Sequence, residues 1–212
     1  MTGTAPIRAN HATTGAPRPV LVWRFGAPRL AASTATVGGG IGVRHWVINA
    51  QVPLAYDRVD LDAHVAELAA VLGCSGSGVG LLTAAAIPDA GQSEDGGVVV
   101  SATVGVSKPT WAADRDDAVG AWQPGTINVV VQVPVRLTDA ALLNAIVTAT
   151  EAKSQALAEQ GVPGTGTASD AVCVLCPLDG AVEPFAGPRS PWGARIARAT
   201  HAAVLRGLAP WG

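Results

Sequence analysis

The stretch GTINVVVQVPVRLTDAALLNAIVTATEAKSQAL, residues 125–157, contains a core strand followed closely by a long helix. Its first part, 125–133, is dominated by Val and Ile, which is typical of a buried strand. Thr138 and Asp139 are then suited to the N-terminal cap of a helix. Apolar side chains recur at helical spacing beyond this cap, and the pattern predicts a helix over 138–160.

Further strands and helices are predicted on both sides of this stretch. The other helices are expected at 60–72, behind Asp60, and at 192–206. Together the elements predict an α+β fold in which helices pack on one or more mixed sheets. The spacing of apolar residues predicts strands at 18–25, 30–37, 43–51, 78–84, 97–107, 125–133 and 170–176.

Two segments of the chain share an order of short motifs. In the first, ATVGGG (35–40) precedes a strand ending INAQVP, an acidic cap, a helix and the strand VGLLTA. In the second, ATVGVS (102–107) precedes a strand ending VVVQVP, then LTD, a helix and the strand AVCVLC. Short matches arise by chance, so the repeat is a hypothesis. It divides one domain into two β-β-α-β units, 30–90 and 97–177, with a ligand site expected at their junction.

Length and cysteine usage bound the organisation of the chain. Its 212 residues suffice for one domain with a sizeable core, which we expect over 18–212 with a C-terminal helix within 190–207. Residues 1–17 lack the apolar stretch of a signal peptide and are expected to be a flexible tail. The three cysteines do not make a disulfide framework, and the two of CVLC, Cys173 and Cys176, are expected to be buried thiols. We therefore expect a cytoplasmic protein.

The low charge of the chain excludes some partners. Charged residues make up 14% of the sequence, against roughly 25% in an ordinary soluble domain. The net charge is −2 without a basic block, so no nucleic-acid partner is expected. No apolar run reaches the roughly 18 residues of a membrane helix. The mean hydropathy of +0.32 favours a large apolar site or a subunit interface, so a homo-oligomer stays open.

The segment QGVPGTGTASDAVCVLCP, residues 160–177, joins a Gly/Thr loop to an apolar strand. It is not a phosphate-binding loop, because no lysine follows the glycines and the loop leads into a strand instead of a helix. The hydroxyls of Thr165, Thr167 and Ser169 and the carboxylate of Asp170 are left at the entrance of the strand. They favour either a catalytic loop or a tight turn in which Asp170 caps backbone amides.

The helix before this loop carries two candidate ionisable groups. Glu151 lies on a polar side that has only this one charge, whereas Lys153 lies at the edge of the apolar stripe. The two side chains diverge by about 200° around the helix and cannot pair directly. If one of them lines a cavity, the other is expected to be structural.

The remaining candidates are scattered. The four histidines have no metal-ligand spacing, so no metal site is predicted. His45 lies on a predicted strand between Arg44 and Trp46, where a structural role is the commoner alternative. The loop 107–125 is long and without periodicity, which is typical of either a functional loop or a surface excursion.

Several motifs occur in the order of one known family. They are RHWVINAQVPLAYD, GVGLLTAA, the stretch 125–157, GTGTASDAV and FAGPRSPWGARIARATHAAV. Over roughly residues 18 to 207 the chain resembles the adenosylcobinamide amidohydrolase family. The chain departs from the family pattern at Ala168-Ser169, where Gly-Thr is usual, but Ser169 keeps the hydroxyl. It also has Arg189 where His is common and Pro191-Trp192 where Lys-Leu is common, so no histidine role is carried over.

The resemblance implies corrinoid salvage. Members cleave the amide that joins a corrin propionate to aminopropanol and so convert adenosylcobinamide to adenosylcobyric acid. The implied substrate brings its own cobalt, and no cofactor is expected. Trp46, Trp111, Trp122 and Trp192 are candidate flat surfaces for the corrin ring, with Asn and Thr side chains reading its amides.

Amide hydrolysis needs an activated nucleophile, donors to the oxyanion and an acid for the leaving amine. The preferred hypothesis makes Glu151 or Asp170 the base on water, with Lys153 and the Thr165–Thr167 amides stabilising the oxyanion. The alternative makes Thr167 or Ser169 a covalent nucleophile. Candidate substrate-binding residues are Thr165, Thr167, Ser169, His45, Asn128, Lys108 and Trp111.

Two other functions stay open. One is a corrinoid-binding or regulatory protein without hydrolysis, which the substitutions in the loop motivate. The other is an amidase of the same architecture for a different amide, because a fold or family does not fix the substrate.

Overall fold

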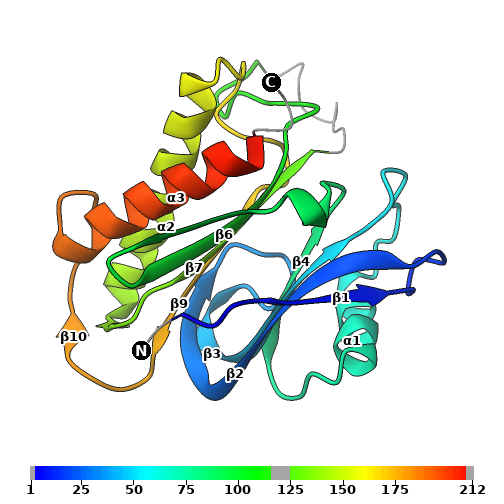
Figure 1. Ribbon diagram of the computed structural model, residues 1–212, viewed down its shortest axis with the longest axis horizontal. Coiled ribbons are helices and arrows are strands. Elements are labelled where there is room, and N and C mark those ends of the chain that lie inside the picture. The colour runs from blue at the N-terminus through cyan, green and yellow to red at the C-terminus, as the bar shows by residue number, and fades with distance from the viewer. Residues whose placement is uncertain (1–2, 116–124, 209–212) are drawn as a thin grey trace.

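The computed structural model describes residues 3–115 and 125–208 and shows an α+β fold with a large mixed sheet (Figure 1). The predicted fold class is confirmed. The helices are α1 (Leu61–Val71), η1 (Ile87–Asp89), a 3₁₀ turn, α2 (Asp139–Glu159) and α3 (Pro191–Leu208). The strands are β1 (Ile7–His11), β2 (Arg18–Ser33), β3 (Gly40–Gln51), β4 (Gly78–Thr83), β5 (Gly91–Asp95), β6 (Val98–Gly105), β7 (Thr126–Gln132), β8 (Arg136–Leu137), β9 (Ala171–Pro177) and β10 (Val182–Glu183).

The three predicted helices lie close to their predicted ends, and α2 begins at its predicted cap. Thr138 caps α2, since its hydroxyl accepts a hydrogen bond from the amide of Ala141 at 3.1 Å. Asp60 stands at the N-cap position of α1 but makes no such bond, because its carboxylate pairs with Arg58 instead. The predicted strands 18–25 and 30–37 form one strand, β2, with a register shift between Arg24 and Arg29.

The N-terminal segment is part of the sheet. β1 pairs antiparallel with β2, with Ile7 opposite Val22 and His11 opposite Arg18. The prediction of a flexible tail over 1–17 is therefore wrong for these residues. The short strand IRANH is mostly exposed, so it lacks the alternation of apolar residues that marks a strand in the sequence.

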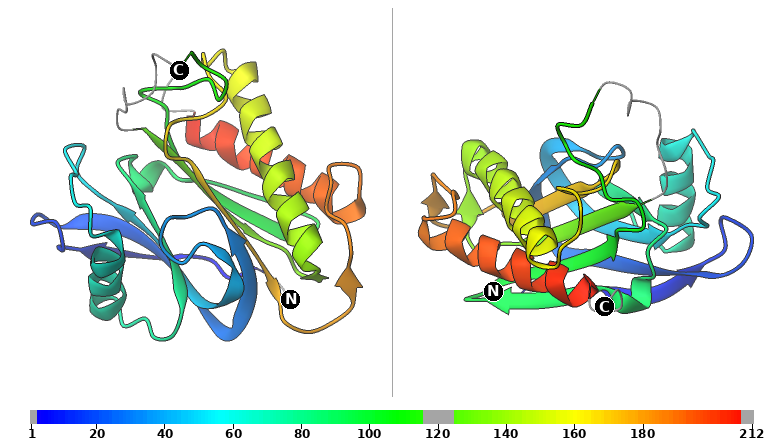
Figure 2. Two further views of the ribbon diagram at one scale, coloured as in Figure 1. Left: turned by 180° about the vertical axis from the view of Figure 1, so that it is seen from behind. Right: turned by 90° about the horizontal axis from the view of Figure 1, so that it is seen from above.

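The sheet folds over itself, so that two of its parts face each other (Figure 2). Its strand order is β4-β3-β2-β9-β7-β6-β5, with β1 beside β2. One apolar cluster joins Val47 and Leu81 of β3 and β4 to Val130 and Leu175 of β7 and β9. A second cluster lies under α1, and a third lies under α2 and α3. The result is a four-layer arrangement with helices on both outer faces.

Buried amide side chains tie the two facing parts together. Asn128 donates to Asn49 Oδ1 and to the carbonyl of Leu82, each at 3.0 Å. Asn49 in turn donates to Thr103 Oγ1 at 3.0 Å. Because buried polar groups are costly without partners, these bonds fix how the two parts meet.

The two segments with the shared motifs also share their connectivity. β2 and β3 are antiparallel, and β3 continues through α1 to the parallel strand β4. In the same way β6 and β7 are antiparallel, and β7 continues through α2 to the parallel strand β9. Equal connectivity does not establish a duplication, which stays a prediction that superposition of the two units tests.

Candidate active site

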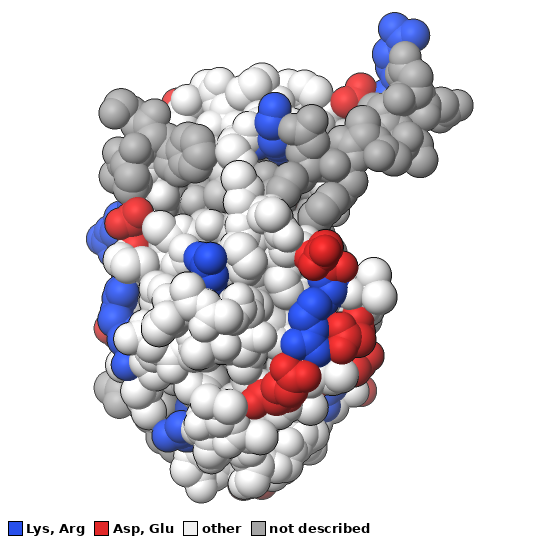
Figure 3. Space-filling model, turned by 90° about the vertical axis from the view of Figure 1, so that its right-hand side faces the viewer, with Lys and Arg blue, Asp and Glu red and all other residues white. Residues whose placement is uncertain are grey.

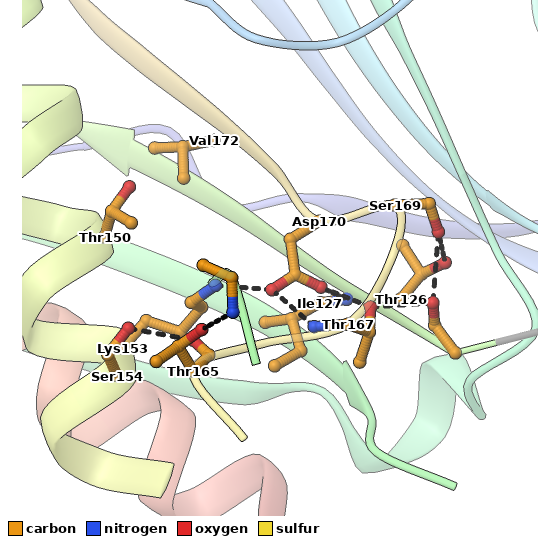
Figure 4. Close-up of polar contacts among 12 residues, drawn as sticks. Thr126, Ile127, Thr150, Lys153, Ser154, Thr165, Thr167, Ser169, Asp170 and Val172 are labelled. Atoms are coloured by element: carbon orange, nitrogen blue, oxygen red, sulfur yellow. Dashed lines mark hydrogen bonds and ion pairs between the residues drawn. The ribbon is translucent and has the colours of Figure 1, made fainter. Parts of the chain in front are cut away.

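A buried ion pair joins the Gly/Thr loop to α2 (Figure 4). Lys153 on α2 donates to Asp170 Oδ2, and the two side chains are only 7% and 13% exposed. The amide of Thr167 also donates to Oδ2 at 3.1 Å, and the amide of Ile127 donates to Oδ1 at 2.9 Å. The Thr167 hydroxyl is a fourth donor. We call Lys153, Thr167 and Asp170 the ion-pair cluster.

The close approach of the pair explains a glycine in the loop. A side chain at Gly166 would collide with Asp170 Oδ2 and with Lys153 Nζ. The neighbouring Thr165 is bonded through its hydroxyl to the amide of Ala112 at 3.0 Å and through its carbonyl to Ser154 Oγ at 2.8 Å. The loop is thus held on several sides, which keeps the residues that follow it in place.

Two hydroxyls meet where β7 and β9 begin. Thr126 Oγ1 and Ser169 Oγ are 2.6 Å apart, and we call them the hydroxyl pair (Figure 4). Ser169 donates to the carbonyl of Gly125 at 3.0 Å, and Thr167 Oγ1 lies 2.7 Å from the same oxygen. Either hydroxyl can be the donor between Thr126 and Ser169; when the Ser169 proton is donated to the carbonyl of Gly125, Thr126 donates to Ser169. A lone pair of Thr126 is then left for a ligand.

The hydroxyl pair borders a cavity of about 380 Å³, which we call the main cavity because both Thr126 and Ser169 line it. This cavity lies between the two facing parts of the sheet. Its lining includes Ser169 and Ala171 but, within the described chain, not Asp170 between them, as expected from alternating side chains. The lining comes from five segments of the chain: 35–37, 52–61, 80–84, 125–128 and 169–171.

A second cavity of about 440 Å³ adjoins the first. Both are lined by Leu54, Ala84, Gly125 and Thr126, so Thr126 lies where the two meet. The shared residues are mostly small or apolar. Together the cavities offer room for a ligand much larger than either one alone.

The segment 52–61 contributes the charged residues of the main cavity. Arg58 forms ion pairs with Asp60 at 2.6 Å and with Glu67 at 2.8 Å. The Arg58 guanidinium lowers the pKa of Asp60 to about 2 and also lowers the pKa of Glu67. Figure 3 shows acidic and basic groups gathered on the side of the molecule that carries α1. Asp57, next to Arg58, is exposed and is also one of the residues that line the main cavity.

The structure brings together some of the predicted site residues. Lys153, Asp170, Thr165, Thr167 and Ser169 lie in one hydrogen-bonded loop region. Asn128 is buried and lines the main cavity. The loop and α2 therefore meet through Lys153, and Glu151 takes no part in this contact. Among the described residues, no member of the ion-pair cluster lines the main cavity, but the cluster adjoins Ser169, which does.

Other predicted residues lie elsewhere. Glu151 is exposed on α2, and Lys108 is exposed at the start of the long loop. Trp111 is 55% exposed. His45 is exposed at the start of β3, with Ser77 Oγ 3.5 Å from its ring, whereas the main cavity lies at the other end of that strand. Glu151, Lys108, Trp111 and His45 therefore do not meet in one pocket.

The tryptophans proposed as flat surfaces also have local partners. Trp46 is buried and donates to the carbonyl of Gly76 at 3.0 Å. Trp192 stacks under the guanidinium of Arg195, 4.4 Å from the ring centre. Trp122 lies outside the described residues. Trp46 and Trp192 are thus engaged in the fold.

We expect Glu151→Gln to change turnover by less than about threefold, because an exposed carboxylate away from the cavity gains little from its charge. Steady-state kinetics with the purified variant measure this. A loss of a hundredfold or more would return Glu151 to the role of base.

Sequence reasoning missed the cavity residues Tyr56, Asp57, Arg58 and Thr126. The signal was present in part, since Tyr56 and Asp57 end the motif RHWVINAQVPLAYD and Thr126 is the second residue of the stretch 125–157. A motif does not show which of its residues face a cavity, because that depends on how the two parts of the sheet meet.

Several expected features concern metals, thiols and membranes. Within residues 3–115 and 125–208, no three His, Cys, Asp or Glu side chains are grouped as metal ligands. The cysteines are free, and burial raises the pKa of the Cys173 thiol to about 12. None of the described helices has the length and apolar character needed to cross a membrane. The prediction that no metal is needed stays a prediction.

Comparison with known proteins supports one family. The family model described as adenosylcobinamide amidohydrolase matches residues 4–212. An adenosylcobinamide amidohydrolase of Methanosarcina mazei is 32% identical over 187 residues, which cover 84% of this chain and 89% of the relative. One of Halobacterium salinarum is 38% identical over 135 residues, 60% of this chain and 57% of the relative. A solved β-aminopeptidase of Burkholderia sp. is 13% identical with a TM-score of 0.48, covering 97% of this chain and 83% of that one.

Proposed function

Since the chain belongs to the adenosylcobinamide amidohydrolase family, we propose that it hydrolyses the amide between the corrin propionate and aminopropanol of adenosylcobinamide. The products are adenosylcobyric acid and free aminopropanol, and the acid serves the rebuilding of cobalamin. The substrate brings the cobalt, so the proposal includes no resident metal or cofactor. It also includes a cytoplasmic location.

The observation that carries the proposal is the hydroxyl pair at the junction of the two cavities. Thr126 lines both cavities, and Ser169 lines the main one. A corrinoid is wide and partly apolar, and a scissile amide at its edge needs polar groups at one point of a large, mostly apolar site. The two adjoining cavities with the hydroxyl pair between them suit such a substrate.

Asp57 is the carboxylate of the main cavity that we assign as the base. It takes a proton from water while the water oxygen attacks the carbonyl carbon of the amide. The carbon–nitrogen bond then breaks, and the same proton passes from Asp57 to the leaving amine. One positioned carboxylate can therefore serve as base and then as acid.

We assign the hydroxyl pair the role of hydrogen-bond donor to the carbonyl oxygen of the scissile amide. In the free protein the two hydroxyls bond to each other, and Ser169 also lies within hydrogen-bond distance of the carbonyl of Gly125. Rotation of the hydroxyls on substrate binding turns them toward the oxygen on which negative charge develops. Donors aimed at that oxygen stabilise the transition state more than the ground state.

The ion-pair cluster is assigned a positioning role in place of the role of base expected for Asp170. Its carboxylate already accepts from four donors, two of them backbone amides, which leaves it poorly placed to take a proton from water. By holding Asp170, the cluster fixes Ser169, its neighbour in the chain. Precise placement of such groups accounts for a large part of catalysis.

The proposal is tested by incubating the purified protein with adenosylcobinamide and measuring free aminopropanol and adenosylcobyric acid by mass spectrometry. We expect equal amounts of both products. Binding of adenosylcobinamide without product would instead support a binding or regulatory protein. Neither binding nor product would favour an amidase for another amide.

Ser169→Ala is expected to lower kcat by about a hundredfold, because it removes one donor to the developing oxyanion. Ser75→Ala is a matched control, since Ser75 is exposed on the turn before β4 and away from the cavity lining. A Ser169→Ala variant with the turnover of the parent would remove the hydroxyl pair from the mechanism.

A further inference from the structure

A chain of hydrogen bonds runs from the main cavity to the N-terminal segment. Tyr56 OH lies 2.6 Å from His64 Nδ1, and His64 Nε2 lies 2.7 Å from Thr13 Oγ1. Thr13 Oγ1 lies 3.0 Å from His11 Nδ1, and His11 Nε2 lies 2.9 Å from the carbonyl of Gln51. We call this series from Tyr56 to Gln51 the hydrogen-bond chain.

The chemistry of the last partner sets the direction of every bond. The carbonyl of Gln51 only accepts, so His11 carries its proton on Nε2 and its Nδ1 accepts from Thr13 when the ring is neutral. Thr13 has one proton, which it gives to His11, so its oxygen accepts from His64 Nε2. His64 Nδ1 is then an acceptor, and the proton of Tyr56 points to it.

The surroundings of the two histidines keep them neutral. His64 is fully buried and His11 is 2% exposed, and burial lowers the pKa of both rings below the ordinary value. Around His64, Arg58 and His11 lower its pKa in the same direction as burial, whereas Glu67 and Asp60 raise it; burial is the largest effect and the pKa stays lowered. Both rings are therefore neutral at pH 7, and the direction of the hydrogen-bond chain is fixed.

Tyr56 connects this chain to the cavity. It lines the main cavity between Leu54 and Asp57, and its ring stacks on His64 with centroids 5.5 Å apart. Its proton is committed to His64, so the lone pairs of the phenol oxygen are the groups that a ligand can use. An oxygen with this orientation accepts hydrogen bonds but does not donate them.

We propose that Tyr56 contacts the substrate as a hydrogen-bond acceptor and that His64, Thr13 and His11 are its positioning residues. The donor it selects is an N–H or O–H group next to the scissile amide, such as the groups of an amino alcohol. The choice of substrate group rests on the proposed function, whereas the positioning of Tyr56 does not. A further consequence is that β1 and the residues after it belong to the site, although they lie far from the cavity in the sequence.

Thr13 offers a matched pair of variants. Thr13→Val keeps the shape and removes the hydroxyl that links the two histidines, whereas Thr13→Ser keeps the hydroxyl. With adenosylcobinamide as substrate, we expect Thr13→Val and Tyr56→Phe each to lower kcat/KM by about tenfold, and Thr13→Ser to stay near the parent. The double variant Thr13→Val/Tyr56→Phe should be no slower than Tyr56→Phe alone, because both changes remove one interaction.

A second readout does not depend on turnover. Tyr56 is the only tyrosine of the chain, so tyrosine labelled at the ring carbon that bears the hydroxyl gives one assignable NMR signal. This signal should shift in Thr13→Val and not in Thr13→Ser. Thermal unfolding of all variants shows whether a change in rate follows from loss of the fold.

The outcomes separate the two proposals. A shifted signal in Thr13→Val supports the positioning of Tyr56 even if the parent protein does not hydrolyse adenosylcobinamide. An unshifted signal overturns the proposal, as does a Tyr56→Phe variant with the kcat/KM of an active parent. Equal losses in Thr13→Val and Thr13→Ser would also overturn it, because the hydroxyl would then not be the group that matters.

Discussion

Lys153→Met is expected to lower the free energy of unfolding by about 3–5 kcal/mol, because it leaves the buried carboxylate of Asp170 without its counter-charge. The two side chains are 7% and 13% exposed, so water replaces little of the lost interaction. Turnover should fall as well, since the loop that carries Ser169 loses its attachment to α2. Urea unfolding followed by circular dichroism measures the change in stability.

Two further variants control this experiment. Lys108→Met removes the charge of an exposed lysine and should change the free energy of unfolding by less than about 0.5 kcal/mol. Lys153→Met/Asp170→Asn should be more stable than the sum of the single changes predicts, because no unpaired charge is left. A Lys153→Met variant as stable as the parent would show that the ion pair does not hold the loop.

Asp57→Asn is expected to lower kcat by about a hundredfold or more while the affinity for adenosylcobinamide changes much less. The substitution keeps the shape of the side chain but removes the group that accepts the proton from water. Steady-state kinetics give the rate, and a binding titration gives the affinity.

The control for this prediction is Asp62→Asn in the first turn of α1. Asp62 is exposed and lies close in the chain, so its change alters the charge of the same surface without touching the cavity lining. Equal rates for Asp57→Asn and the parent would rule out Asp57 as base, and Glu151 would again need consideration.

The sequence predicted most helices and strands because their patterns are local. The apolar spacing and the Thr138 cap are enough to place α2, and the Val-rich run is enough to place β7. The strand β1 was not predicted, because its stability comes from pairing with β2 along an exposed edge. The folding of the sheet over itself depends on strands that are distant in the sequence, so no local pattern contains it.

The candidate site was predictable only as residue types. The Gly/Thr loop and Asp170 were recognised, but the partner of Asp170 on α2 depends on which side of the helix faces the loop. That side carries Lys153, whereas Glu151 points to solvent. The segment 52–61 and the hydrogen-bond chain to His11 arise where β1, β3 and α1 meet, and such meetings are visible only in three dimensions.

The most direct test of the account is hydrolysis of adenosylcobinamide in water enriched in the heavy isotope of oxygen. The account predicts that aminopropanol is released and that each adenosylcobyric acid formed carries one heavy oxygen atom in its new carboxylate. Mass spectrometry of the product gives this directly. If no acid forms, or if the acid formed carries no heavy oxygen, water is not the group that cleaves the amide in this protein, and the account is contradicted.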